Sequence, residues 1–376
     1  MVTTDQAAPG PVIRDLKGGI VVPIPSDIDT PQPLNTGVLT QDRAQVPESI
    51  TWRGGNRWTF DPRIPEPQEI QQMEGRYLFA GLLYGHFGHF LVESTARLWA
   101  VDQLRDQLDG IVFVPKVQRR LDAVKDNYQP FFDLLGLDLP IYNLAEPTAC
   151  ERLFVPPQGF GMFGMIQGLP VYRDFMRNRL AKSIGEGGAR KIYVSRSDLT
   201  HQRGGILGEV RLEAFLADQG YDVFHPQNHS FEAQLQAYKS ADYIISPDGS
   251  PLHMAALVAR PGTKVAVIAR RPNIALQFRY QFSAFCQIDT VTVDALINHW
   301  IPESEDLPNR LSYGELDETV VCDTLASAGF VASDARWPKM TDAERQEIMA
   351  VLETRQRGKF KLFIPGLVNP PLKQAP

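Results

Sequence analysis

Cysteine is scarce in this chain, and its scarcity excludes two ways of stabilising a fold. Among 376 residues there are three cysteines, Cys150, Cys286 and Cys322, which lie far apart and form no Cys-x-x-Cys pair. This spacing is typical neither of a disulfide framework nor of a zinc site. We therefore expect three reduced, mostly buried thiols and a fold that depends on its hydrophobic core.

Long apolar runs and an excess of positive charge are also missing. The longest apolar run, residues 77–92, is interrupted by glycine and histidine and is too short to span a membrane. The first residues lack the basic and apolar regions of a signal peptide. A formal net charge of −6 gives no overall reason to bind nucleic acid. These features favour a cytoplasmic protein that has no transmembrane segment and no nucleic-acid partner.

The common cofactor motifs are absent as well. The chain contains no Gly-x-Gly-x-x-Gly, no P-loop, no Gly-x-Ser-x-Gly elbow and no His or carboxylate cluster with metal spacing. Asp27-Ile28-Asp29 has the form of an Asp-x-Asp metal clamp, but it lies in an irregular, proline-rich segment. We interpret it as a solvated loop. We expect no metal and no other cofactor.

What the chain does contain is a regular alternation of strands and helices in two blocks. Helical patterns over about ten residues or more separate the strands, which predicts parallel sheets with right-handed crossovers. We expect an α/β fold of two Rossmann-like domains that face each other across a cleft. The predicted strands are 77–84, 111–114, 141–143, 153–155, 191–194, 221–225, 243–245 and 264–268, and the predicted helices include 89–104, 118–137, 209–219, one capped by Ser230, and one after Pro251.

Composition suggests where the domains begin and end. Residues 1–70 are rich in proline and are expected to form an extended arm with one or two short strands, residues 71–184 a first Rossmann-like domain, and residues 185–335 a second one. The glycine-rich loop 185–188 is the expected boundary. Residues 336–376 are expected to form a last helix and a tail, and Thr341 with Glu344 forms a capping box at the start of that helix.

The loop that follows the predicted strand 243–245 is the first candidate binding site. It reads Asp248-Gly249-Ser250-Pro251, and Pro251 occupies a position that suits the first turn of a helix. Backbone N–H groups of Gly249, Ser250 and Leu252, together with the helix dipole, favour a phosphate at such a helix start. The alternative is a well-formed turn and N-cap without a ligand.

Two arginines follow the first strand of the same block. Arg196 comes directly after the predicted strand 191–194, and Arg203 lies in the loop that leads to the next helix. Ligands in parallel sheets bind beyond the carboxyl ends of the strands. A planar guanidinium pairs with two oxygens at once, which suits a diphosphate. Ordinary surface arginines are the alternative interpretation.

The first block has its own cluster of polar residues. His89, Glu93 and Arg97 recur every four residues, which places them on one face of the predicted helix, and His86 precedes them. A histidine and a carboxylate at this position can accept a proton from a hydroxyl group. The alternative is a capping histidine and a Glu93–Arg97 ion pair. Either His89 or Glu93 is a candidate base.

These segments, in this order, resemble glycosyltransferase family 61, whose bacterial members are often associated with capsular polysaccharide synthesis. The similarity extends over roughly residues 85–270 and rests on His89-Phe90-Leu91-Val92-Glu93 with Arg97, Tyr193-Val194-Ser195-Arg196, Arg203, Glu209, Phe231-Glu232-Ala233-Gln234 and the loop 246–252. It implies a GT-B architecture with an acceptor domain first and a nucleotide-sugar domain second, inversion at the anomeric carbon, and no Asp-x-Asp metal site.

One residue departs from the family pattern. Asp248 stands where the family usually has histidine, and Pro251 precedes Leu252. The stretch from Asp248 to His253 is similar to the donor loop of heptosyltransferases. Both families place this loop against the donor, so the departure affects the identity of the donor nucleotide more than the reaction.

The sequence thus predicts an inverting glycosyltransferase that moves a sugar from a nucleotide-diphosphate sugar to a saccharide acceptor, in capsular or cell-surface polysaccharide synthesis. Peripheral association with a polysaccharide assembly complex fits this role. A pyruvyl transferase-like or epimerase-like enzyme and a catalytically degenerate sugar- or nucleotide-binding protein are the alternatives. The expected catalytic residues are Glu93, His89 and His86, and the expected donor-binding residues are Arg196, Arg203, Glu209, Asp248, Gly249, Ser250, Leu252 and His253.

Overall fold

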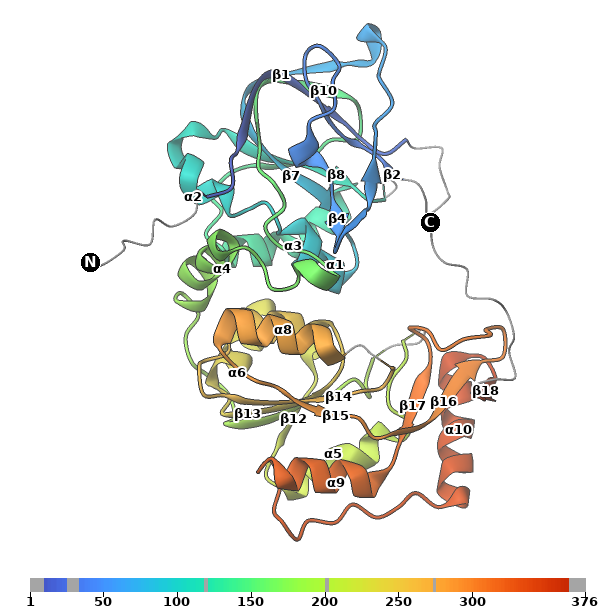
Figure 1. Ribbon diagram of the computed structural model, residues 1–376. Helices are drawn as coiled ribbons and strands as arrows, with labels where there is room; N and C mark the ends of the chain where they lie inside the picture. Colours follow the sequence, from blue (N-terminus) through green and yellow to red (C-terminus); the bar gives the residue numbers. More distant parts are fainter. Residues whose placement is uncertain (1–9, 26–33, 118–120, 200–202, 273–274, 365–376) are drawn as a thin grey trace, which may run out of the picture. The chain divides into compact units, whose positions relative to one another are not determined.

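The computed structural model describes residues 10–25, 34–117, 121–199, 203–272 and 275–364. The chain divides into two compact units, Met1–Ile184 and Gly185–Pro376, and each unit contains its own main sheet (Figure 1). The predicted α/β class is confirmed. The GT-B arrangement and the finer domain limits stay predictions, and the Asp27-Ile28-Asp29 motif lies outside the described residues.

The sheet of the first unit has six strands in the order β3-β1-β10-β7-β8-β9. The last four of these are parallel neighbours, and their core strand β8 is buried along its whole length, as is typical of parallel sheets. The strands are β1 (Arg14–Val22), β3 (Gly37–Leu39), β7 (Gln71–Leu83), β8 (Gly110–Pro115), β9 (Ile141–Asn143) and β10 (Thr148–Val155).

The amino-terminal segment differs from the extended arm that composition predicts. Strand β1 pairs antiparallel with β10 over seven residue pairs, and β3 pairs antiparallel with β1, so the sheet is mixed instead of parallel throughout. The sequence conceals β1 because Gly18 and Gly19 interrupt its pattern and its first residues are polar. Residues 20–22 nevertheless belong to the buried core.

A second difference concerns the helix predicted over 89–104, which is broken in the structure. A short helix α1 (Phe87–His89) leads into a π-helical turn, Phe90–Ser94, and helix α2 (Ala100–Leu104) begins later. The hydroxyl of Thr95 donates to the carbonyl of Leu91, a contact that competes with regular helix bonds. The other helices of this unit are α3 (Leu121–Leu134) and α4 (Pro170–Met176).

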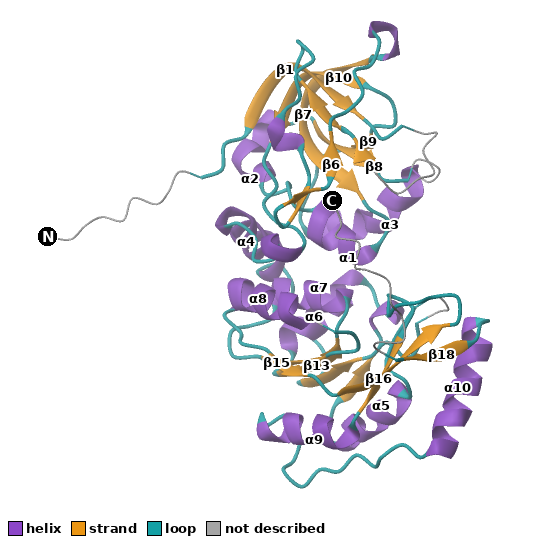
Figure 2. Cartoon of the chain, turned by 45° about the vertical axis from the view of Figure 1, so that its right-hand side comes forward, coloured by secondary structure: helices purple, strands orange, loops and turns teal. Residues whose placement is uncertain are grey.

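The sheet of the second unit has five strands, all parallel, in the order β12-β11-β13-β14-β15. Figure 2 shows α6, α7 and α8 over one face of this sheet and α5 and α9 over the other. The strands are β11 (Lys191–Val194), β12 (Asp222–Phe224), β13 (Tyr243–Pro247), β14 (Lys264–Ile268) and β15 (Val291–Val293), and the helices are α5 (Glu209–Asp218), α6 (Phe231–Ser240), α7 (Ser250–Val258), α8 (Ala275–Cys286) and α9 (Glu318–Ser327).

Several predicted features of this unit are confirmed residue by residue. Strands β11 and β14 have the predicted bounds, and the hydroxyl of Ser230 accepts from Ala233 N at the start of α6. The predicted capping box of Thr341 and Glu344 opens helix α10 (Asp342–Gln356). Helix α10 lies beside a small antiparallel sheet of β16 (Leu296–Pro302), β17 (Tyr313–Leu316) and β18 (Phe360–Phe363) (Figure 1).

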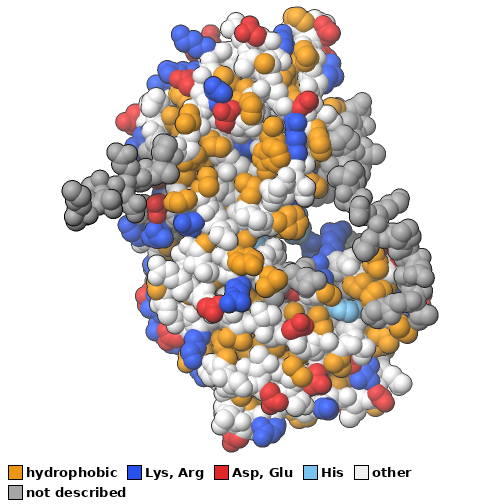
Figure 3. Space-filling view, in the orientation of Figure 1, with side chains coloured by type: hydrophobic (Ala, Val, Ile, Leu, Met, Phe, Trp, Pro, Cys, Tyr) orange, Lys and Arg blue, Asp and Glu red, His pale blue; other side chains and the backbone are white. Residues whose placement is uncertain are grey.

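The three cysteines are free and buried, as expected from their spacing. On the face seen in Figure 3, acidic, basic and hydrophobic side chains are interspersed. Within the described ranges, none of the helices combines the length and the apolar character needed to cross a membrane.

Candidate functional site

Charged residues follow three neighbouring strands of the second unit at their carboxyl ends. Arg196 comes two residues after β11, Asp248 directly after β13, and Arg270 and Arg271 after β14. Because β11, β13 and β14 are parallel neighbours, these residues meet at one edge of the sheet. This edge is where open α/β sheets bind ligands.

Asp248 is the centre of this cluster. Its side chain is fully buried, and its Oδ2 accepts a hydrogen bond of 2.8 Å from the backbone N of Arg270. Its Oδ1 lies 3.1 Å from Nη2 of Arg270 and 3.5 Å from Nη2 of Arg271. The carboxylate therefore holds two arginines in place and is itself shielded from a ligand.

Arg196 completes the cluster. Its Nη2 donates to the carbonyl of Gly204 at 3.1 Å. Burial, and then the positive charge of Arg270, lowers the pKa of Arg196 to about 10. Among the described residues, Nε of Arg196, Nη1 of Arg270 and Nε of Arg271 are buried without a hydrogen-bond partner. Three guanidinium groups gathered around the single carboxylate of Asp248 leave an excess of positive charge that is suited to bind an anion such as phosphate.

Glu209 supports Arg196 from behind. This glutamate is buried, and its Oε1 accepts from the backbone N of Arg196 at 2.8 Å and from the hydroxyl of Tyr193 at 2.9 Å. Burial raises the pKa of Glu209, while the hydrogen bond from Arg196 acts in the opposite direction. Its contacts are those of a residue that positions Arg196.

Gly249 lies against the guanidinium of Arg196. A Cβ at this position would lie 2.9 Å from Nη1 of Arg196, closer than side chains pack. The backbone N–H groups of the next residues are less available to a phosphate than the sequence suggests. The backbone N–H of Leu252 already donates to the carbonyl of Gly249 at 3.1 Å and is therefore not free for a phosphate. Helix α7 begins at Ser250, slightly earlier than the predicted start near Pro251, and Ser250 remains a candidate.

The side chains of Leu252 and His253 face the interior. They are 1% and 5% exposed, and Nδ1 of His253 lies 2.6 Å from Oε1 of Gln281 on α8. These contacts attach α7 to α8.

Arg203, by contrast, is exposed, and it lines a cavity of about 430 Å³ together with Arg196. The structure thus brings the two predicted arginines to one cavity.

Glu93 forms the centre of a second cluster, in the first unit. Its side chain is 1% exposed, and Arg53 binds it with two hydrogen bonds, 2.7 Å from Nε to Oε1 and 2.9 Å from Nη2 to Oε2. Nδ1 of His89 lies 2.6 Å from Oε2. Burial favours a higher pKa, but hydrogen bonds from His89 and Arg53 outweigh it and hold the pKa of Glu93 below its ordinary value.

His89 is the more accessible member of this cluster, with a side chain that is 32% exposed. Because its Nδ1 faces the carboxylate of Glu93, Nε2 is the nitrogen that can take a proton from a substrate. The ring lies between two aromatic neighbours, with centroids 5.3 Å from Tyr84 and 5.2 Å from His86. Arg53 is itself held over the ring of Trp58, at 3.5 Å.

Arg97 does not join this cluster, so the Glu93–Arg97 ion pair of the alternative interpretation is wrong. Arg97 is 1% exposed and donates to the backbone carbonyls of Pro156, Glu48 and Ile50 at 3.1, 3.1 and 2.8 Å. Burial lowers the pKa of its guanidinium to about 10. The π-helical turn removes the regular spacing on which the predicted pair depended.

Three site residues were missed by sequence reasoning. Arg270 and Arg271 follow β14 just as Arg196 follows β11, so their position after a predicted strand was an available signal. Arg53 carried no such signal. It lies in a two-residue strand, β4 (Trp52–Arg53), 40 positions before Glu93. Over the described ranges, no group of three or more His, Cys, Asp or Glu residues is placed to hold a metal ion.

Comparison with known proteins agrees with the resemblance seen in the motifs. The family model described as Glycosyltransferase 61 matches residues 87–266. The match contains both clusters except for Arg53, Arg270 and Arg271. No curated protein matches the chain. The matched residues carry the motifs on which the resemblance rests, so the resemblance to glycosyltransferase family 61 is confirmed over residues 87–266.

Proposed function

We propose that this glycosyltransferase moves a sugar from a nucleotide-diphosphate sugar to a saccharide acceptor, with inversion at the anomeric carbon and without a metal. The arginine cluster, Arg196, Arg270 and Arg271 around Asp248, is the observation that supports a diphosphate donor. The family match supports the reaction class. A role in capsular or cell-surface polysaccharide synthesis is part of the proposal.

The arginines serve the leaving group in this proposal. When the bond between the anomeric carbon and the phosphate oxygen breaks, negative charge builds up on the departing diphosphate. Guanidinium groups that are already in place stabilise this charge without reorganisation. Arg196 and Arg271 are partly exposed and contact the phosphates. Arg270 is 4% exposed, so it contributes positive charge without contacting the phosphates.

His89 serves as the base. Its Nε2 takes the proton of the acceptor hydroxyl while that oxygen forms the new bond to the anomeric carbon. Glu93 accepts a hydrogen bond from Nδ1–H and stabilises the imidazolium that results. Arg53 keeps Glu93 ionised, so Glu93 is a positioning residue in this scheme, and His86 lies next to the base.

A donor screen tests the proposal. The purified protein is incubated with a panel of nucleotide sugars and saccharide acceptors, and transfer and donor hydrolysis are measured. Arg196→Ala is expected to lower kcat/KM by about 10²- to 10³-fold, since it removes a preorganised donor to the leaving group. Arg190→Ala is the control, because Arg190 forms an exposed ion pair with Asp242.

The base is tested with His89→Asn. This variant is expected to lower kcat by about 10²-fold or more and to leave KM for the donor unchanged.

Near-normal transfer by Arg196→Ala contradicts the phosphate assignment. Binding of nucleotides without turnover favours a degenerate binding protein, and no response to any nucleotide sugar favours the pyruvyl transferase-like alternative.

A further inference from the structure

The last turn of helix α10 holds the loop that follows strand β11. Arg355 donates from Nη1 to the carbonyl of Ser197 at 2.5 Å and from Nη2 to the carbonyl of Leu199 at 2.6 Å. The backbone N of Leu199 donates in turn to the carbonyl of Arg196 at 3.1 Å. One exposed guanidinium thus fixes the turn that begins at Arg196, although Leu199 lies 156 positions earlier in the chain than Arg355.

The next residue of the same turn is connected to the second arginine of this loop. Nε2 of Gln356 donates to the hydroxyl of Tyr313 at 2.7 Å, and that hydroxyl donates to the carbonyl of Arg203 at 2.7 Å. A hydroxyl group can accept one hydrogen bond while it donates another. Two consecutive residues of α10 therefore hold the backbone beside Arg196 and at Arg203.

The guanidinium of Arg196 depends on its loop surroundings for its position. Arg270 and Arg271 are anchored by the carboxylate of Asp248. Nη2 of Arg196 donates instead to a backbone carbonyl, that of Gly204, at 3.1 Å. The position of this guanidinium therefore follows from two loops, the one that carries Arg196 and the one that carries its acceptor.

Strand β17 holds the loop that carries this acceptor. The backbone N of Gly204 donates to the carbonyl of Arg310 at 2.9 Å. Gly314 on β17 donates to the carbonyl of Gly205 at 3.0 Å and accepts from the backbone N of Leu207 at 2.9 Å. The small antiparallel sheet thus positions the carbonyl to which Arg196 donates.

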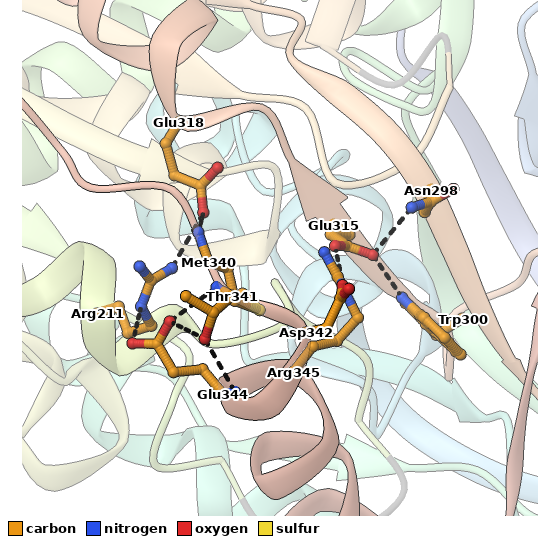
Figure 4. A network of polar contacts seen from close by, with 10 residues as sticks. All are labelled: Arg211, Asn298, Trp300, Glu315, Glu318, Met340, Thr341, Asp342, Glu344 and Arg345. Atoms are coloured by element: carbon orange, nitrogen blue, oxygen red, sulfur yellow. Dashed lines mark hydrogen bonds and ion pairs between the residues drawn. The ribbon is translucent and has the colours of Figure 1, made fainter.

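Helix α10 is itself attached to this small sheet. Figure 4 shows Arg345 of α10 bound to Oε1 of Glu315 on β17, at 2.6 Å. Oε2 of Glu315 accepts from Asn298 and Trp300 on β16, at 3.0 and 2.9 Å. Glu315 is 1% exposed, and a buried polar network whose members all have partners is rigid. The helix that carries Arg355 is therefore held in a defined position.

Helix α10 is also connected to α5. Arg211 on α5 lies 3.0 Å from Oε1 of Glu318 and 3.8 Å from Oε1 of Glu344, which belongs to the first turn of α10 (Figure 4). Glu209, on the same helix α5, accepts from the backbone N of Arg196 at 2.8 Å. Helices α5 and α10 are thus connected to each other, and each of them holds the backbone at or next to Arg196.

The contacts of Arg355 differ from those of a helix cap. A basic side chain in the last turn of a helix can bond the free carbonyls of its own helix. In α10 the backbone provides this bonding, because Arg357 N donates to the carbonyl of Thr354 at 3.3 Å and Gly358 N to that of Glu353 at 3.1 Å. The guanidinium of Arg355 donates to a different loop. Its contacts are therefore those of a residue that acts on the loop after β11.

We propose, on the basis of the function proposed above, that Arg355 is a positioning residue of the transferase. It holds the loop after β11 so that the guanidinium of Arg196 meets the diphosphate, and it acts through Arg196 without contacting the phosphates. Arg355 and the strands beside α10 lie beyond residues 87–266, outside the family match. The carboxyl-terminal part of the chain thus contributes to the geometry of the anion site.

A double-mutant cycle tests this role. Arg355→Ala and Arg196→Ala are made singly and together, and the affinity of each protein for pyrophosphate is measured by calorimetry. Arg355→Ala is expected to weaken binding by about tenfold, because the loop loses two hydrogen bonds from a charged donor. In the Arg196→Ala background the same substitution is expected to change the affinity by less than about twofold, since the residue through which it acts is gone.

Arg357→Asn is the control for the loss of charge. Arg357 is exposed two positions further along the chain, and its backbone φ of 55° is one that asparagine tolerates. This variant is expected to bind pyrophosphate like the unaltered protein. If it weakens binding as much as Arg355→Ala does, the effect comes from the net charge and the positioning role is wrong.

The other outcomes separate the role of Arg355 from the proposed function. If Arg355→Ala weakens binding equally with and without Arg196, Arg355 acts on the anion independently and does not position Arg196. If Arg355→Ala binds pyrophosphate with unchanged affinity while Arg196→Ala binds it more weakly, the phosphate site stands and the role of Arg355 is wrong. If the unaltered protein does not bind pyrophosphate, the proposed function itself fails. Circular dichroism of all variants shows that they are folded.

Discussion

Arg53 binds both carboxylate oxygens of Glu93, although the two residues are 40 positions apart in the chain. The side chain of Arg53 is 14% exposed and that of Glu93 is 1% exposed, so the pair is largely removed from water. An ionised carboxylate is stable at such a site only while its partners remain. In the proposed mechanism the orientation of His89 depends on this carboxylate, and the stability of the first unit is expected to depend on the pair as well.

Arg53→Ala is therefore expected to lower the free energy of unfolding by about 3–5 kcal/mol, because it leaves a buried carboxylate without its main partner. Urea denaturation measures this loss. Arg63→Ala is the control, because Arg63 and Glu69 form an exposed pair whose loss is expected to change the free energy of unfolding little. Equal losses in the two variants contradict the structural role of Arg53.

Acid is expected to destabilise the protein through Glu93. Its pKa in the folded protein lies below the ordinary value of 4.5, so the unfolded chain binds the proton more readily. The stabilisation is complete above the unfolded pKa and is lost as the pH falls through the folded pKa. Glu93→Gln should therefore flatten the decrease in the free energy of unfolding between about pH 5 and pH 3. If the free energy of unfolding falls with pH in the same way for Glu93→Gln and for the unaltered protein, Glu93 is not the source of the acid sensitivity.

Gly249→Ala is expected to weaken the binding of pyrophosphate by about tenfold, because the new Cβ would lie 2.9 Å from Nη1 of Arg196 and displace the guanidinium. Gly185→Ala is the matched control, since the nearest atom to its Cβ is 4.0 Å away. Calorimetry with pyrophosphate gives both affinities. If Gly249→Ala binds pyrophosphate with unchanged affinity, the position of the Arg196 guanidinium does not affect anion binding.

Asp248→Asn tests the centre of the arginine cluster. Loss of the buried charge leaves Arg270 and Arg271 without their carboxylate, and the free energy of unfolding is expected to fall by about 3–5 kcal/mol. An anion that binds the folded protein offsets part of this loss. Pyrophosphate should therefore raise Tm more in the variant than in the unaltered protein. A smaller increase in the variant argues against an anion site here.

Much of the second unit follows from local sequence. Strands β11 and β14 are short apolar runs between turn residues, and helices α6 and α10 begin at Ser230 and Thr341, whose side chains cap them. Each of these signals acts over a few residues, through burial of neighbouring side chains or a hydrogen bond to the third residue along. Arg196 and Asp248 could be selected because they directly follow such strands.

Other features depend on contacts between distant segments. Strand β1 belongs to the main sheet of the first unit because β10 offers it an edge, although its own pattern is weak. Arg97 turns away from Glu93 because the helix breaks and three distant carbonyls accept its hydrogen bonds. Arg53, and not Arg97, forms the ion pair with Glu93.

The sequence by itself determined the α/β class, most element positions in the second unit and the residues at strand ends, because these depend on periodic burial and local capping. Only the tertiary structure decided that Asp248 anchors Arg270 and Arg271, and that Glu93 orients His89 under the control of Arg53. Buried charges must find their partners wherever the fold brings them together, and no local pattern records which distant residue that is.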